Sequence, residues 1–346
     1  MTRGFKITPS LAVLSVLVIL VTLAALRYDG FLGTYNVQSV LRYVSMFALV
    51  SLGMCFVIMS GGIDLSVGTT AAMCSVISAL LSSYGLLPGL AGGVAGGLLI
   101  GVLNGILITQ LKILPFIATL ASMLAASGTG LLLAGNQSVS VSYDTYFTNL
   151  GQGDLLSFMR PAWVDAEGVN TLGSFLGFIL SFPTPAWIAI AAYVVGGLVI
   201  TQTAFGRHVL AVGGGSEASR LMGLPVDRTV FLVYVISGGL AGLAGVILAS
   251  QFGAGQPIEG VGWELFAIAS VVVGGTLLSG GKGSVLGTLV GALLLGVIYT
   301  ILNFENGMGW ISLSAYWQSV VRGVFLLVVV ILQSRLSSRD KLNAKA

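Results

Sequence analysis

The feature that most constrains this chain is a series of long apolar stretches without a single charged side chain. A helix needs about 20 apolar residues to cross the hydrocarbon core of a membrane, and several stretches exceed that length. Only 8% of the residues are charged and 56% are hydrophobic, whereas about 25% are charged in an ordinary soluble domain. The chain must therefore fold in lipid. The runs are continuously apolar and do not alternate, which favours helices over a membrane β-barrel. They are Ile7–Leu26, Tyr43–Ile63, Leu65–Leu111, Ile113–Tyr143, Gly168–Phe205 and Thr229–Ile258.

The predicted fold is an all-α membrane protein in which residues 1–346 form a single transmembrane domain of about ten helices. Tyr84-Gly85 and Pro88-Gly89 divide the longest run, because glycine and proline interrupt helices. Residues 135–183 are too polar to cross and form the one substantial outer loop, and residues 203–228 form a charged loop on the opposite side. We expect crossings near 9–26, 41–60, 67–84, 86–109, 114–134, 184–202, 229–251, 265–278, 285–302 and 314–333.

The distribution of lysine and arginine predicts the orientation of the bundle. Positive residues accumulate on the cytoplasmic side of membrane proteins. With both termini cytoplasmic, that side receives Arg3, Lys6, Lys112, Arg207, Arg220, Arg228, Lys282, Arg335, Arg339, Lys341 and Lys345, and the outer side receives only Arg27, Arg42 and Arg160. The charged loop at 203–228 is therefore predicted to be cytoplasmic.

Glycines spaced by four residues predict close helix packing. They recur from Gly93 to Gly105 in the fourth crossing, at Gly238 and Gly242 in the seventh, and in the ninth crossing. Small residues let helix backbones approach one another in lipid, so we expect a compact bundle, with the contacts either within one chain or between chains. A faint internal repeat at an offset of 219 residues relates Ala48, Ser51, Ser60, Gly61 and Gly62 to Ala267, Ser270, Ser279, Gly280 and Gly281.

Several functional classes lack the residues they require. His208 is the one histidine and has no second ligand or base at helical spacing, so neither a metal site nor a catalytic triad is predicted. The sequence Leu278–Lys282, LSGGK, lacks the surrounding residues of a phosphate-binding loop and is interpreted as a tight turn between helices. A net charge of +3 gives no indication of nucleic-acid binding. We therefore predict no enzyme activity and no cofactor.

The segment SGGIDLSVG, residues 60–68, joins two apolar runs without a polar loop and places Asp64 at or within the membrane boundary. An ionisable residue there is costly and indicates a functional site. Gly61, Gly62 and Ser66 suggest a broken helix that lines a cavity, so these residues and Asp64 are candidates for a translocation pathway or gate. The alternative is that Asp64 caps the third crossing. Glu264 is a further candidate at the start of the eighth crossing.

The loop at 203–228 places several charged residues next to glycines. Its order is Gly-Arg, then Gly-Gly-Gly, then Glu-Ala-Ser-Arg, then Met-Gly-Leu. A solvated connection would account for the charges alone. The order instead predicts a short helix bracketed by glycines and presented to another protein.

Four long motifs, in this order, resemble the permease subunits of ribose/galactose-type ABC importers. They are SGGIDLSVG at 60–68, LKILPFIATLA at 111–121, FGRHVLAVGGGSEASRLMGL at 205–224 and IASVVVGGTLLSGGKGSVLGT at 268–288. The resemblance covers residues 36–332. AIASVVVGGTLLSGGKG and ILNFENG make the chain look closest to the second permease of the galactofuranose importer.

This resemblance implies a permease subunit that moves a monosaccharide across the inner membrane while a separate ABC ATPase hydrolyses ATP. It implies further partners: a second permease, identical or paralogous, and a periplasmic sugar-binding protein. The helix that couples to the ATPase would lie at about 215–223, and the residues assigned to coupling are Arg207, Gly214, Gly215, Glu217, Ala218, Arg220 and Gly223. The alternative is a stand-alone secondary transporter or channel for a small polar solute, which would have no need of such a helix.

The sequence departs from the family pattern at two positions. Gly215 stands where asparagine is frequent, and Phe266 stands where an acidic residue is frequent. The first departure is expected to loosen the start of the coupling helix. The second removes any ion pair at position 266.

Overall fold

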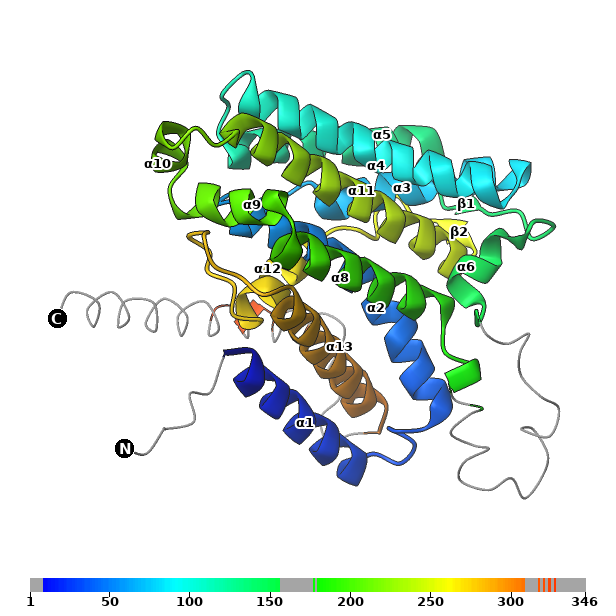
Figure 1. Cartoon of the computed structure of the whole chain (residues 1–346). Coiled ribbons are helices and arrows are strands. Elements are labelled where there is room, and N and C mark those ends of the chain that lie inside the picture. The colour runs from blue at the N-terminus through cyan, green and yellow to red at the C-terminus, as the bar shows by residue number, and fades with distance from the viewer. Residues whose placement is uncertain are drawn as a thin grey trace, which may run out of the picture.

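A computed structural model describes residues 9–155 and 179–308, together with Gly177 and single positions at 317, 320, 323, 324 and 327. Helices dominate these residues and form one bundle (Figure 1). Eight of the described helices are long and apolar enough to cross a membrane. They are α1 (Pro9–Arg27), α2 (Thr34–Met59), α3 (Val67–Leu81), α4 (Leu86–Thr109), α5 (Pro115–Ala134), α8 (Thr184–Gln202), α11 (Val226–Phe252) and α13 (Val285–Met308).

Eight of the ten predicted crossings correspond to these helices, which confirms the all-α membrane class. The 3-10 turn η1 (Ser82–Tyr84) ends the third crossing, and α4 begins directly after Gly85. The tenth predicted crossing, 314–333, lies almost wholly outside the described residues, as do Arg322 and both chain termini.

The eighth predicted crossing, 265–278, is wrong as a continuous helix. Helix α12 (Trp263–Val273) has only 11 residues, about 16 Å at 1.5 Å per residue, against a hydrocarbon core of about 30 Å. It is preceded by non-helical backbone at 253–262, where four glycines and Pro257 interrupt helix formation. Apolar composition predicted the location of this element but not its break.

The break before α12 runs along α3 inside the bundle. Gly255 lies against Val76 near the outer end of α3, and Gly260 lies against Gly68 near its beginning; an added Cβ at either position would overlap α3. The Ser75 hydroxyl accepts a hydrogen bond from the Gln256 N–H at 2.9 Å. Non-helical backbone at membrane depth is tolerated where protein surrounds it, and α3 supplies that surrounding here.

The glycines spaced by four residues pack helices of this chain against each other. Helices α4 and α11 pack along much of their length. An added Cβ at Gly97 would overlap the Gly238 carbonyl oxygen and lie 2.7 Å from the Gly242 Cα, and one at Gly101 would lie 2.9 Å from the Val235 Cα. Backbones this close exclude any larger residue, so the small residues hold α4 and α11 together within one chain.

Helix α2 is the centre of the core. All of its residues from 44 to 59 are buried. It contacts α11, α12, α13 and α8. Phe47 packs on Trp263 and Phe266 of α12, with ring centroids 4.5 and 4.4 Å apart. Phe266, where the family pattern has an acid, therefore contributes an aromatic ring to the contact between α2 and α12.

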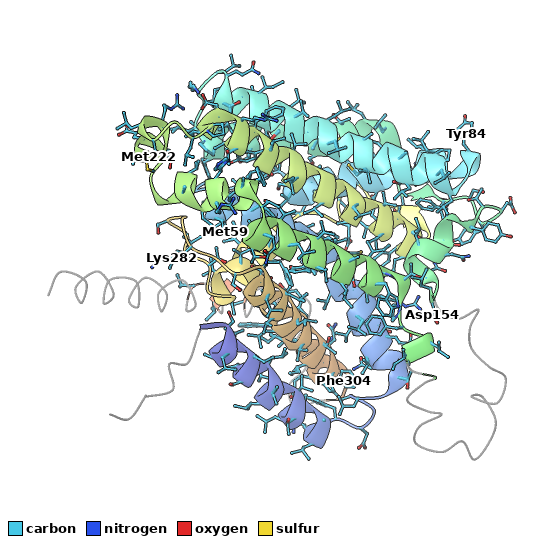
Figure 2. All side chains as sticks on the ribbon, in the orientation of Figure 1. Met59, Tyr84, Asp154, Met222, Lys282 and Phe304 are labelled. Carbon is cyan, nitrogen blue, oxygen red and sulfur yellow. The ribbon has the colours of Figure 1, made fainter. Side chains whose placement is uncertain are left out.

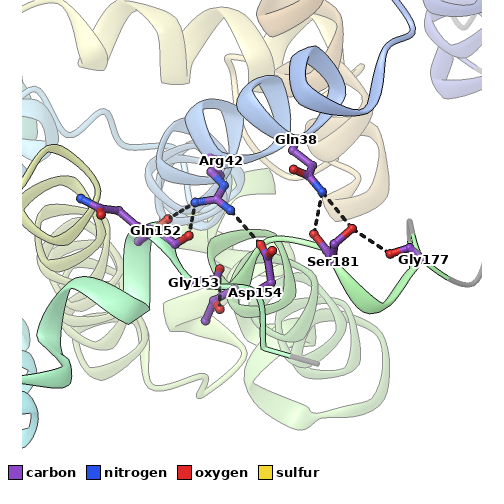
Figure 3. Close-up of polar contacts among 9 residues, drawn as sticks. Gln38, Arg42, Gln152, Gly153, Asp154, Gly177 and Ser181 are labelled. Carbon is purple, nitrogen blue, oxygen red and sulfur yellow. Dashed lines mark hydrogen bonds and ion pairs between the residues drawn. The ribbon is translucent and has the colours of Figure 1, made fainter. Parts of the chain in front are cut away.

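The described part of the predicted outer loop is folded against the bundle. It contains strand β1 (Val139–Ser140), which pairs antiparallel with β2 (Ala254–Gly255), the 3-10 turn η2 (Tyr146–Thr148) and α6 (Asn149–Gln152). Arg42 of α2 donates to Asp154 at 2.7 Å and to the Gln152 carbonyl, and Gln38 donates to the Ser181 carbonyl at 2.9 Å (Figure 3). These bonds fix residues 152–154 and Ser181 of the loop to α2.

The connections alternate between two ends of the bundle, as the predicted topology requires. Met59, Met222 and Lys282 lie at one end, and Tyr84, Asp154 and Phe304 lie at the other (Figure 2). The first of these ends is the one predicted to face the cytoplasm.

Candidate functional site

Residues 60–66 leave the end of α2 and enter the bundle as non-helical backbone before α3 begins. Asp64 is only 1% exposed. Its Oδ1 accepts hydrogen bonds from the Ser66 N–H at 3.0 Å and the Ser66 hydroxyl at 2.6 Å, and its Oδ2 accepts from the Ser237 hydroxyl at 2.9 Å. Among the described residues, all hydrogen-bond donors to this buried carboxylate are neutral. They come from Ser237 of α11 and from Ser66 in the same turn as Asp64.

The network continues from Ser66 into two further helices. Asn104 of α4 donates to the Ser66 hydroxyl at 3.0 Å, and Ser122 of α5 donates to the Asn104 Oδ1 at 2.5 Å. All of these side chains are buried. Buried polar groups that are fully hydrogen-bonded fix a single arrangement of the elements that carry them. The Asp64 network therefore joins the start of α3 to α4, α5 and α11.

The prediction that Asp64 caps the third crossing is wrong in its geometry. The residue that precedes α3 is Ser66, and no side chain caps the helix there. Asp64 instead accepts from the N–H two residues further on, which is the geometry of an Asx turn. Its carboxylate stabilises the turn that leads into α3 and links that turn to α11.

Gly62 lies within this turn, and Glu264 lies beside the first turn of α3 that follows it. An added Cβ at Gly62 would overlap the Tyr234 hydroxyl, so glycine is required there by packing. Glu264 opens α12, but it lies beside Gly68 at the break in the bundle and not at the outer surface. Its Oε2 is buried without a hydrogen-bond partner among the described residues. The structure thus brings Glu264 close to the first turn of α3, at Gly68, and places Gly61 against Gly213 and Gly280 instead.

The predicted short helix in the 203–228 loop is present as α10 (Ser216–Leu221), preceded by α9 (Ala204–Gly214). Thr203 caps α9 by accepting from the Gly206 N–H at 3.2 Å. Gly215 separates the two helices, and Gly223, at a φ of +78°, adopts the left-handed conformation that follows a helix end. Figure 1 shows α10 projecting from the end of the bundle.

The charged residues of this loop have different environments. Arg207, Glu217 and Ala218 are exposed, as are Gly214 and Gly223. Arg220 instead donates to Asp227 at 2.8 Å, and Lys112 lies 2.9 Å from the same carboxylate. Exposed ion pairs of this kind contribute at most about 1 kcal/mol, so they orient α10 against the bundle without fixing it rigidly.

Three glycine-containing segments meet where α9 ends. An added Cβ at Gly213 would overlap the Met59 carbonyl oxygen and lie 2.6 Å from the Gly281 nitrogen, and Gly281 donates to the Met59 carbonyl at 3.0 Å. An added Cβ at Gly280 would lie 2.9 Å from the Gly61 Cα. The tight turn predicted at 278–282 is confirmed by the Leu277 N–H bonding to the Lys282 carbonyl at 3.1 Å. We call these contacts among Met59, Gly61, Gly213, Gly280 and Gly281 the glycine junction.

The sequence reasoning missed several residues of these sites. Asn104, Ser122 and Ser237 are polar residues inside apolar runs, and that isolation is the signal that would have found them. Gly213 was passed over in favour of Gly214 and Gly215. At the tip of α10, Leu221 and Met222 are 90% and 68% exposed, an apolar pair that the charge-based argument ignored.

Comparison with known proteins identifies the family. Residues 36–330 match the family model described as "Branched-chain amino acid transport system / permease component". The chain belongs to this family of permeases. It is 37% identical to the ribose import permease protein RbsC of Bacillus subtilis, over 93% of this chain and 92% of the relative. It is 34% identical to the L-arabinose transport system permease protein AraH of Escherichia coli, over 94% and 90%. It is 36% identical to the inner membrane ABC transporter permease protein YjfF of Escherichia coli, over 90% and 87%. No solved structure matches the chain.

The protein is therefore a multi-pass permease subunit of an ABC importer in the cytoplasmic (inner) membrane, and it is not itself an enzyme. This assignment excludes the stand-alone carrier or channel. The permease has eight described membrane helices and no group of three His, Cys, Asp or Glu residues among the described residues that would hold a metal ion.

Proposed function

We propose that this permease imports a monosaccharide of the ribose, galactose or galactofuranose class. The support is its similarity along nearly the whole chain to permeases named for ribose and arabinose. The sugar would pass along a route gated by the non-helical segments that precede α3 and α12, with Asp64 and Ser66 in the first and Glu264 in the first turn of α12.

The proposed importer contains three further components. An ABC ATPase docks on α10 at the cytoplasmic end, a second permease completes the membrane part, and a periplasmic sugar-binding protein delivers the substrate to the outer end. Arg207, Glu217 and Arg220 are the proposed polar contacts to the ATPase, and Gly215 and Gly223 allow α10 to tilt as one unit.

The glycine junction is the observation that carries this mechanism. It places the end of α9, one residue before the α10 hinge, against the backbone that ends α2 and the turn that follows α12. The turn containing Asp64 begins at Gly61, and α12 begins at Trp263, next to Glu264, which lies beside the first turn of α3. A displacement of α10 by the ATPase would therefore reach both broken crossings through backbone contacts, without a flexible side chain between them.

The test compares Gly213→Ala with Gly214→Ala in the importer reconstituted with its ATPase and binding protein. A Cβ at Gly213 overlaps Met59, whereas nothing lies within 4 Å of a Cβ at Gly214. Overpacking costs about 1–3 kcal/mol, so we expect Gly213→Ala to lower uptake of radiolabelled sugar per ATP hydrolysed about tenfold. Gly214→Ala should match the wild type.

Two results would contradict the proposal at different points. If Gly213→Ala transports normally, the junction does not transmit the movement of α10. If the wild-type permease neither recovers an ATPase on purification nor supports uptake of ribose, galactose or galactofuranose, the assignment as a sugar importer subunit is wrong.

A further inference from the structure

A cavity opens between α9 and the first two turns of α11. Figure 1 shows α10 next to these two helices. Its volume is about 210 Å³, several times the roughly 30 Å³ that one water molecule occupies in the liquid. Six residues line it: Phe205, His208, Pro225, Arg228, Thr229 and Leu232. This cavity plays no part in the glycine junction or in the Asp64 network.

The charges at the mouth of the cavity are unbalanced. Arg228 and His208 make no hydrogen bond or ion pair with any other described residue, and none of the six lining residues is acidic. Asp227 is adjacent in sequence, but its carboxylate accepts from Lys112 and Arg220. This acid is therefore already paired with two cations, and Arg228 and His208 offer hydrogen-bond donors to a ligand.

The cavity changes from polar to apolar along α11. On α11, Leu232 follows Arg228 by one turn, about 6 Å deeper into the bundle, and on α9 Phe205 and His208 share one face three residues apart. The Thr229 hydroxyl is satisfied by the Pro225 carbonyl at 2.8 Å, so the inner part of the cavity offers mainly apolar surface. A ligand that fits has a negative group at one end and hydrocarbon at the other.

We propose that this cavity binds the headgroup of an anionic phospholipid from the leaflet at this end of the bundle. Arg228 and His208 donate to the phosphate oxygens, and Phe205 and Leu232 contact the first acyl carbons. Basic pockets between transmembrane helices bind anionic headgroups by this combination of charge and apolar contact. Because α9 leads into α10, a lipid bound here fixes the base of the coupling loop.

The experiment measures lipid retention by native mass spectrometry of the assembled importer in non-ionic detergent. The importer is supplied with equal amounts of dioleoyl phosphatidylglycerol and dioleoyl phosphatidylcholine. We expect preferential retention of phosphatidylglycerol by the wild type. Arg228→Ala should reduce this preference about fivefold, which corresponds to the loss of about 1 kcal/mol for one cation near an anionic lipid. Combining His208→Ala with Arg228→Ala should reduce the preference for phosphatidylglycerol further.

Lys282→Ala is the matched control, because Lys282 carries the same charge at the same end of the bundle but does not line the cavity. An equal loss in Lys282→Ala would show diffuse attraction and overturn the proposal. Displacement of the lipid by inorganic phosphate would also overturn the proposal, because Phe205 and Leu232 would then contribute nothing to binding. Absence of any phosphatidylglycerol preference in the assembled importer would also overturn it, because the ATPase would then occupy the cavity. Elution of each variant as an intact complex on size-exclusion chromatography shows that it is folded.

Discussion

At the scale of single residues, Asp64 shows how a charge is tolerated inside this bundle. Its carboxylate is buried and balanced by two hydroxyls and one backbone N–H, from Ser66 and Ser237. The sequence predicted that Asp64 lies in the membrane region. It could not predict Ser237, which is 173 residues away, because no local pattern records which helices will meet.

The Asp64 network predicts different outcomes for two substitutions. Asp64→Asn keeps one acceptor oxygen and adds an amide that can donate to a rotated Ser237 hydroxyl, so the fold should survive. Asp64→Ala leaves three buried donors unpaired at about 1–3 kcal/mol each. We expect Asp64→Ala to lower the thermal unfolding midpoint in detergent clearly more than Asp64→Asn does.

Transport per folded molecule distinguishes a structural role for Asp64 from a role in the pathway. If the carboxylate contributes to the route or its gate, Asp64→Asn should lower sugar uptake although the protein is stable. Normal uptake per molecule by the Asn variant would restrict Asp64 to holding α3 against α11. The measurement is uptake into proteoliposomes, normalised to the amount of folded permease.

At the scale of elements, the sequence predicted which segments are helices much better than where they are interrupted. Eight predicted crossings are present because about 20 apolar residues in lipid have few alternatives to a helix. The path of residues 253–262 along α3 was not predicted, because no local pattern records which helix will cover a glycine-rich segment. Whether such a segment is helical depends on α3, against which its backbone is buried.

Helix α10 is an element whose function should reside in its exposed tip. Leu221 and Met222 project from its C-terminal end, and Glu217 lies in its first turn. Truncating exposed apolar residues has little effect on an isolated fold, but it removes contact area where a partner covers them. We expect Leu221→Ser combined with Met222→Ser to reduce recovery of the ATPase on a tagged permease, and Glu217→Arg to uncouple hydrolysis from uptake.

A matched control for α10 is Lys282→Ala, an exposed residue at the same end of the bundle but on the turn after α12. It should leave recovery of the ATPase close to wild type. Undiminished recovery by the double serine variant, together with normal coupling in Glu217→Arg, would show that the ATPase docks elsewhere.

At the scale of the whole molecule, the two non-helical segments approach each other at the start of α3. Residues 60–66 precede α3, whereas residues 253–262 precede α12 and reach the first turn of α3, where Gly260 lies against Gly68. Discontinuous helices of this kind mark substrate and gating regions in transporters. The faint repeat at an offset of 219 residues relates the turn at Gly61 to the turn at Gly280, and these two turns are in contact.

The orientation of the bundle determines which end meets the ATPase, and single introduced cysteines test it. Cys55 and Cys74 are buried and free, so they should give little background with a membrane-impermeant maleimide. Tyr84 and Met222 are 77% and 68% exposed at opposite ends. The excess of lysine and arginine on the side of Met222 predicts that this end is cytoplasmic. In spheroplasts, Tyr84→Cys should therefore be labelled at once, and Met222→Cys only after permeabilisation. The reverse pattern would place α10 outside the cell, where no ATPase could reach it, and the proposed coupling through the glycine junction would be untenable.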